Sequence, residues 1–149
     1  QFLVIPVLET MPPWFPKLPQ CDSKGMTNKC VKTIGGYDLS GLTKRNLHGM
    51  TVQQYYDLLE HQQFKCPLSG KEFTYDPEKC KFVDINGKVP PVDHDHNTGY
   101  IRGILTERIN WLESQWELGT YGQLTKPVEL TEYQTNPPAY GVIGKIFYD

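Results

Sequence analysis

A run of four residues, Asp93-His94-Asp95-His96, constrains this chain more than any other feature. The run gathers two carboxylates and two imidazoles, and it holds half of the four histidines in the 149-residue chain. A hydrophobic core does not collect such groups unless they pair with one another or bind a ligand. The run therefore predicts a functional site, and the alternatives are a surface turn or a zinc site.

The residues around this run predict a strand, a turn and a second strand. Residues 89–92 lead into the first strand, which carries Asp93 and His94, and the polar stretch 97–99 breaks it. Residues 100–105 have the composition of a return strand. The run is thus expected to lie at the end of a two-stranded hairpin.

A helix is expected to follow this hairpin, from Thr106 as its cap through residue 118. Ile109, Leu112 and Trp116 form an apolar stripe along it. Asn110 lies about one residue away from that stripe, so its side chain is expected to point toward the strand pair.

These side chains suit the hydrolysis of a phosphodiester with one metal ion. Such a reaction needs a hard cation on the phosphate and a base that takes a proton from water. Asp93 and Asn110 offer the oxygen ligands that Mg²⁺ prefers, and Mn²⁺ is the expected substitute. His94 is the expected base, because its ordinary pKa leaves much of it neutral near pH 7. It follows a metal ligand on the strand, so its side chain points to the other face, where a water could sit.

Three nearby residues have roles that the sequence leaves open. Asp95 or a backbone carbonyl orients an imidazole, and His96 either contacts the phosphate or is a further ligand, so both are counted as catalytic candidates. Arg102, on the return strand, either holds a phosphate of DNA or pairs with an aspartate. The remaining histidines, His48 and His61, occur singly and are expected to be structural or exposed.

The rest of the chain predicts further short elements. A helix is expected over residues 51–62, since Thr51 and Gln54 form a capping box ahead of an apolar repeat of helical spacing. Residues 72–75 and 81–85 read as short strands, with a hairpin-type turn at 86–87, and a last short helix is expected over 125–133 before a Pro137-Pro138 tail.

The N-terminal part differs from the rest in composition and charge. Residues 1–20 contain five prolines, which predicts an extended arm, and residues 21–50 show no sustained periodicity. From Lys17 to Arg45 there are six basic and two acidic residues, a balance of +4, whereas residues 106–149 have three basic and six acidic residues, a balance of −3. Lys44 and Arg45 are therefore candidate DNA contacts, and the alternative is a solvated arm.

These observations give an α+β chain in three parts: an irregular Pro-rich arm over residues 1–44, a catalytic core over 45–118 and a C-terminal extension over 119–149. No apolar run is long enough to cross a bilayer, so a soluble protein without a membrane partner is expected. Four cysteines without a Cys-x-x-Cys pair or a visible secretory signal indicate reduced thiols in an intracellular compartment.

Several stretches over about residues 45–112 together resemble a known family. They are Leu47-His48-Gly49-Met50-Thr51, Phe64-Lys65-Cys66-Pro67-Leu68-Ser69-Gly70, Val92-Asp93-His94-Asp95-His96-Asn97-Thr98-Gly99 and Ile101-Arg102-Gly103-Ile104-Leu105. The family is the recombination endonuclease VII group of HNH nucleases, also called ββα-metal or His-Me finger nucleases.

The resemblance implies a ββα-metal core with Asp93 and Asn110 as metal ligands, His94 as general base and His96 as an aid at the phosphate. It also implies a DNA substrate, often a homodimer, and a phage or mobile-element source, which would place the protein in the host cytoplasm.

The sequence departs from its relatives where they hold a structural zinc with two Cys-x-x-Cys pairs. The first pair survives only as Cys66 with Ser69, and Thr106 and Ile109 replace the second. This argues against a structural zinc, and packing by Leu68, Ile109 and Leu112 is expected to brace the site instead.

The sequence thus predicts a metal-dependent DNA endonuclease that cuts in a homing-type or nicking reaction. Alternatives are a resolvase of Holliday junctions or other branched DNA, a nuclease that also degrades RNA, and a DNA-binding or virion component that keeps the nuclease scaffold without catalysis.

Overall fold

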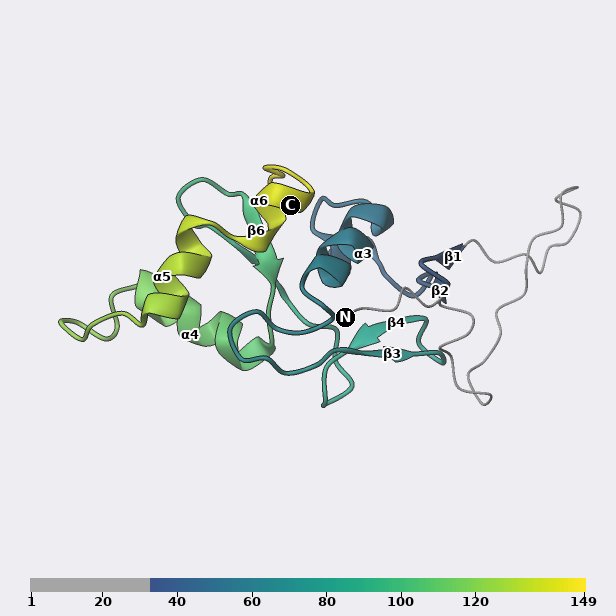
Figure 1. Cartoon of the computed structure of the whole chain (residues 1–149), viewed down its shortest axis with the longest axis horizontal. Helices are drawn as coiled ribbons and strands as arrows, with labels where there is room; N and C mark the ends of the chain where they lie inside the picture. The colour runs from purple at the N-terminus through teal and green to yellow at the C-terminus, as the bar shows by residue number, and fades with distance from the viewer. Residues whose placement is uncertain (1–32) are drawn as a thin grey trace, which may run out of the picture.

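The computed structural model describes residues 33–149 and shows a mixed helix and strand chain, as the sequence predicts (Figure 1). The elements are β1 (Thr33–Ile34), β2 (Tyr37–Asp38), α2 (Lys44–Leu47), α3 (Val52–His61), β3 (Thr74–Asp76), β4 (Lys81–Val83), β5 (Val92–His94), β6 (Ile101–Ile104), α4 (Glu107–Glu117), α5 (Val128–Thr135) and α6 (Pro138–Val142). The strands form three separate antiparallel pairs, β1–β2, β3–β4 and β5–β6. The predicted arm of residues 1–20 and the basic residues before position 33 lie outside the described residues.

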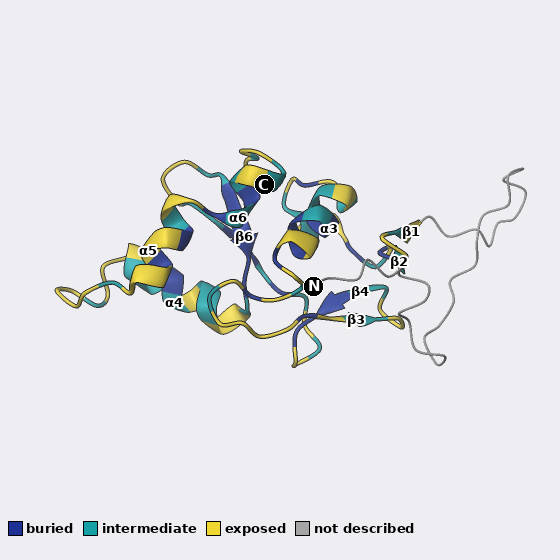
Figure 2. Ribbon diagram, in the orientation of Figure 1, coloured by how far each residue is buried: buried dark blue, intermediate teal, exposed yellow. Residues whose placement is uncertain are grey.

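Helix α3 confirms the capping box predicted at its start. The Thr51 hydroxyl accepts a hydrogen bond from the Gln54 backbone N–H at 3.1 Å, and the Gln54 side chain accepts one from the Thr51 backbone N–H at 2.9 Å. The apolar face that follows buries Tyr55, Leu58 and Leu59 completely. Figure 2 shows this buried face of α3 close to the buried strand β6.

One buried side chain ties the end of α3 to β6. The Gln62 amide donates to the Ile104 carbonyl at 2.8 Å, and the Gln62 carbonyl accepts from the Ile104 N–H at 2.9 Å. Strand β6 has β5 on one side, so Gln62 satisfies backbone groups of β6 that have no strand partner there. The β5–β6 hairpin is thereby fixed to helix α3.

The β3–β4 pair agrees with the two predicted strands, but its surroundings correct one expectation. Asn86 and Gly87 do form a turn, in which the Asp84 carboxylate accepts from the N–H groups of Asn86 and Lys88. That turn does not close a hairpin, because β4 before it and β5 after it belong to different sheets. The hairpin turn lies instead at residues 77–80, between β3 and β4.

The C-terminal part is more ordered than the sequence suggests. Helix α5 begins and ends two to three residues later than predicted, and the expected Pro137-Pro138 tail opens helix α6, with Pro138 in its first turn. Helix α6 packs on β6 and α3, and Ala139 within it is fully buried. Residues expected to form an extension therefore complete the core.

The last residues of the chain run between the hairpin and the segment before α3. Ile146 accepts a hydrogen bond from the Ile101 N–H at 2.8 Å, and the Tyr148 N–H donates to the Gly99 carbonyl at 2.8 Å. On the other side, the Asp149 N–H donates to the His48 carbonyl at 3.0 Å. Gly49 permits this approach, since a Cβ there would lie 2.8 Å from a backbone oxygen.

Within residues 33–149, no helix combines the length and apolar character needed to cross a bilayer.

Candidate active site

The β5–β6 hairpin presents the acidic and imidazole run, as predicted. Asp93 pairs with Gly103 and His94 with Ile101, and the register is irregular between Asp93 and His94. The two side chains separate as strand alternation requires, since Asp93 is buried and His94 is half-buried. The residue left without a partner in this register is Arg102, in β6.

Asp95 does not orient an imidazole in this structure. Its carboxylate accepts hydrogen bonds from the N–H groups of Asn97, at 2.7 Å, and Thr98, at 3.4 Å. These bonds form an Asx-type turn that carries the chain to Gly99, whose φ of +81° suits glycine. Burial opposes the charge of Asp95, but the two backbone donors prevail and lower its pKa. Asp95 thus shapes the hairpin turn.

A buried ion network surrounds Asp93. Arg102 binds the Asp93 carboxylate with two nitrogens, Nε at 2.9 Å and Nη2 at 3.2 Å, and both side chains are at most 3% exposed. Arg102 Nη2 also contacts Glu113 and, at 2.8 Å, Glu117. The Tyr133 hydroxyl donates to Asp93 Oδ2 at 2.9 Å. One guanidinium therefore serves three carboxylates.

The surroundings in this network shift the pKa values of Asp93 and Arg102. Burial raises the pKa of Asp93, although Arg102 and Tyr133 oppose that shift. Burial alone would lower the pKa of Arg102, but its three carboxylate partners raise it further above its usual value. Arg102 consequently stays charged, and of its two expected partners, a phosphate or an aspartate, the structure has the aspartate.

The His94 ring lies at the edge of this network. Its centroid is 3.9 Å from that of Tyr148, with 20° between the planes, and 4.8 Å from that of His96. Burial, followed by the nearby charges of His96 and Arg102, lowers the pKa of His94. A neutral imidazole near pH 7 can accept a proton, and within the described residues neither His94 ring nitrogen forms a hydrogen bond.

His96 has a defined partner on helix α4. Its Nδ1 lies 2.9 Å from Glu117 Oε2, while the imidazole remains 44% exposed. Glu117 thereby joins His96 to Arg102 and, through it, to Asp93. The carboxylate that orients an imidazole is therefore on the helix and not in the hairpin run.

Asn110 lies in the second turn of α4, three residues before Glu113. That spacing places it on the face of the helix that meets Arg102. Its carboxamide forms no hydrogen bond to any described residue, so both amide atoms are uncommitted.

Asp93 and Asn110 offer oxygen atoms that can be compared with the ligands that a divalent cation requires. From Arg102 and Tyr133, Asp93 Oδ2 accepts two hydrogen bonds and Oδ1 accepts one, so Oδ1 is the less committed oxygen toward these two residues. The described residues contain no group of three or more His, Cys, Asp or Glu arranged for a metal. One carboxylate oxygen and one amide oxygen, with water completing the shell, is nonetheless a set that suits Mg²⁺.

The remaining candidates divide by exposure. Lys44 and Arg45, in α2, are exposed and available to a phosphate backbone. Arg102 is only 2% exposed, so its guanidinium is held inside the protein and not at the surface. DNA contact by Lys44 and Arg45 stays a prediction.

The segments that would carry the relatives' zinc pairs meet directly. The Thr106 hydroxyl lies 3.9 Å from the buried Cys66 sulfur. Leu68 and Ile109 pack against the core as expected, whereas Leu112 is not part of that cluster. Thr106 occupies the predicted N-cap position of α4, but its side chain forms no capping hydrogen bond there.

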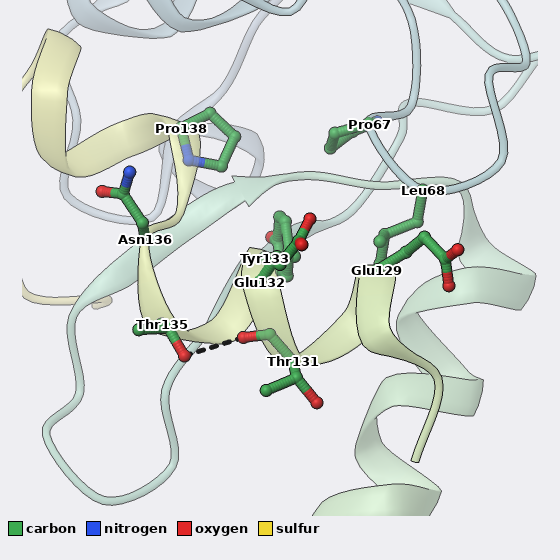
Figure 3. A pocket seen from close by; sticks show the side chains of 9 residues that line it. All are labelled: Pro67, Leu68, Glu129, Thr131, Glu132, Tyr133, Thr135, Asn136 and Pro138. Carbon is green, nitrogen blue, oxygen red and sulfur yellow. Dashed lines mark hydrogen bonds between the residues drawn. The ribbon is translucent and has the colours of Figure 1, made fainter.

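A pocket of about 690 Å³ lies beside the ion network of Asp93 and Arg102, between residues 67–68 and helix α5 (Figure 3). Tyr133 lines it and also binds Asp93, so the pocket adjoins the back of the site. Glu129 and Glu132 line it as well, which disfavours a phosphate there.

Sequence reasoning missed five residues of the site. Glu113 and Glu117 follow Asn110 at helical spacings of three and seven, a signal that would have found them. His48, Tyr133 and Tyr148 carry no local signal, because they reach the hairpin only through the folded C-terminal part. His48, expected to be merely structural or exposed, stacks on Tyr148 at 4.3 Å.

Comparison with known proteins defines the class of the chain. The profile of the recombination endonuclease VII family matches residues 41–133, which include the hairpin, α4 and Tyr133. The chain therefore belongs to the recombination endonuclease VII family.

Two curated phage proteins are similar to the chain. The Gene 59 protein of Mycobacterium phage L5 is 30% identical over 98 residues, and that of Mycobacterium phage D29 is 29% identical over 98 residues. Each match covers 66% of this chain and 51% of the relative, so the chain spans about half the length of these proteins. No solved structure matches the chain.

Proposed function

We propose that this protein is a Mg²⁺-dependent DNA endonuclease in which β5, β6 and α4 form a ββα-metal core of the HNH type. The observation that carries the proposal is His94, next to the buried Asp93: burial lowers the pKa of this imidazole, and within residues 33–149 neither of its ring nitrogens forms a hydrogen bond. A general base must be unprotonated at the reaction pH and must have a free atom that can accept the proton. Membership of the recombination endonuclease VII family supports a nuclease.

In this proposal Asp93 Oδ1 and the Asn110 amide oxygen would hold the cation, which would stabilise negative charge on the scissile phosphate and leaving oxygen. His94 takes a proton from the attacking water at one of its free ring nitrogens. Arg102 favours the ionised form of Asp93 against the effect of burial and fixes its orientation, because two of its nitrogens bind both carboxylate oxygens.

His96 and Glu117 serve the phosphate in the same scheme. Glu117 engages Nδ1 of His96, which leaves Nε2 for a phosphate oxygen. The ring is exposed enough for a backbone to reach it. Lys44 and Arg45 are proposed to hold the phosphate backbone further along the DNA, as exposed cations do in nucleic-acid binding.

A second candidate, resolution of branched DNA, is favoured by the family to which the chain belongs. It uses the same chemistry on a different substrate shape. The homodimer that the family resemblance implies also stays a prediction.

The experiment is cleavage of supercoiled plasmid, of linear and four-way branched DNA, and of generic RNA by the purified chain with Mg²⁺ or Mn²⁺. We expect nicked or linear DNA products with either metal, none with EDTA, and intact RNA. Faster cutting of the branched substrate would select the resolvase. DNA binding without any cutting would contradict the proposal and favour a non-catalytic scaffold.

A further inference from the structure

Tyr148 lies between two histidines of the site. Its ring is nearly parallel to both, with centroid distances of 3.9 Å to His94 and 4.3 Å to His48 and interplanar angles of 20° and 11°. Two imidazoles at these distances cannot share one face of a phenol ring without colliding, so they occupy opposite faces. The Tyr148 hydroxyl is also 3.5 Å from His48 Nε2.

The backbone holds Tyr148 in this place from both sides. Its N–H donates to the Gly99 carbonyl in the hairpin turn, and the next N–H, of Asp149, donates to the His48 carbonyl. Phe147 pairs with Tyr100 in the adjoining bridge. The tyrosine is therefore anchored to the turn after His94 and to the loop that carries His48.

Within residues 33–149, the His94 ring contacts two other rings, Tyr148 at 3.9 Å and His96 at 4.8 Å, and forms no hydrogen bond. Catalytic histidines are commonly oriented by a hydrogen bond that the N–H of the second ring nitrogen donates to a carboxylate or a carbonyl. Among the described residues, His94 makes no such bond, and the Asp95 carboxylate accepts hydrogen bonds from backbone N–H groups of the turn. Of the two ring contacts, the one with Tyr148 is closer and nearly parallel, at 20°, whereas the His96 ring is tilted by 51°, so stacking on Tyr148 is the contact that can set the orientation of the imidazole.

We propose that Tyr148 is a positioning residue that holds the His94 imidazole in the orientation needed to take a proton from water. The inference rests on the proposed function. Tyr148 lies beyond residues 41–133, so this device belongs to the part of the chain outside the family match. The His48 ring supports the stack from the far face of Tyr148.

The test compares the full chain with Tyr148→Phe, which keeps the flat ring, and Tyr148→Leu, which removes it. Plasmid nicking should give Y148L a kcat about 10- to 100-fold lower than that of the wild type, with KM little changed, because a misplaced base slows the chemistry and not DNA binding. Y148F should keep most of the activity. Phe147→Leu, at the neighbouring and 65% exposed position, is the matched control and should cut normally.

A second readout needs no activity and no metal. In NMR spectra of histidine-labelled protein, the Tyr148 ring should shift the ring protons of His94 upfield in the wild type and Y148F, and this shift should be lost in Y148L, while His61 stays constant. Tyr148→Met replaces Y148L if the latter does not fold. Wild-type kcat in Y148L, or His94 shifts that ignore the ring, would overturn the inference, whereas absence of cutting by the wild type would overturn the proposed function.

Discussion

Replacing Arg102 with leucine is expected to lower the free energy of unfolding by roughly 3–5 kcal/mol, the usual cost of removing one partner from a buried ion pair. The guanidinium is the cation that the described structure places among three carboxylates, those of Asp93, Glu113 and Glu117. Without it, charges that are 0–19% exposed would face one another in the core. Urea unfolding followed by tryptophan fluorescence measures the change.

Lys88→Leu is the matched control for that experiment. Lys88 also pairs with a glutamate, Glu107, but at 3.7 Å and with side chains that are 68% and 69% exposed. Exposed pairs contribute about 0–1 kcal/mol, so K88L should unfold almost like the wild type. If R102L were as stable as K88L, the carboxylates around Arg102 would not be ionised together, and the network described above would be wrong.

Replacing His94 with alanine is expected to lower the rate of plasmid nicking by about 10²- to 10⁴-fold, the range typical for loss of a general base. Binding of DNA should change little, because in the proposed mechanism the half-buried imidazole accepts a proton and does not contact a phosphate. Burial lowers the pKa of His94, which favours the neutral ring that this role requires. Single-turnover kinetics with saturating enzyme separate the chemical step from binding.

His61→Ala serves as the control, because His61 is an exposed histidine at the end of α3, away from the ring stack of the site. H61A should cut at the wild-type rate. Equal rates for H94A and the wild type would remove His94 as the base and direct attention to His96, the other imidazole of the run.

The hairpin and its helix were predictable because their signals are local. A polar break separates two apolar stretches, and Thr106 takes the N-cap position of the helix found over Glu107–Glu117, although its side chain forms no capping hydrogen bond. The Thr51 capping box and the apolar repeat after it predicted the bounds of α3 to within one residue at each end. Strand alternation likewise separated buried Asp93 from half-buried His94.

What escaped prediction depends on contacts between distant parts of the chain. Tyr133 reaches Asp93 across 40 residues, and Tyr148 reaches His48 across 100. Two adjacent prolines suggested a tail, yet a proline in the first turn of a helix is compatible with α6. The role of Asp95 was left open by the sequence, and in the structure its carboxylate accepts from backbone donors two and three residues ahead, as Asp at the start of a tight turn commonly does.

The proposed mechanism depends most on a divalent cation held jointly by Asp93 and Asn110. Soaking crystals of the protein in MnCl₂ and recording anomalous diffraction tests this directly. We predict one strong anomalous peak between Asp93 Oδ1 and the Asn110 amide oxygen, with Arg102 still bound to Asp93. A map without density between those two side chains, while manganese occupies other sites, would contradict the proposed mechanism.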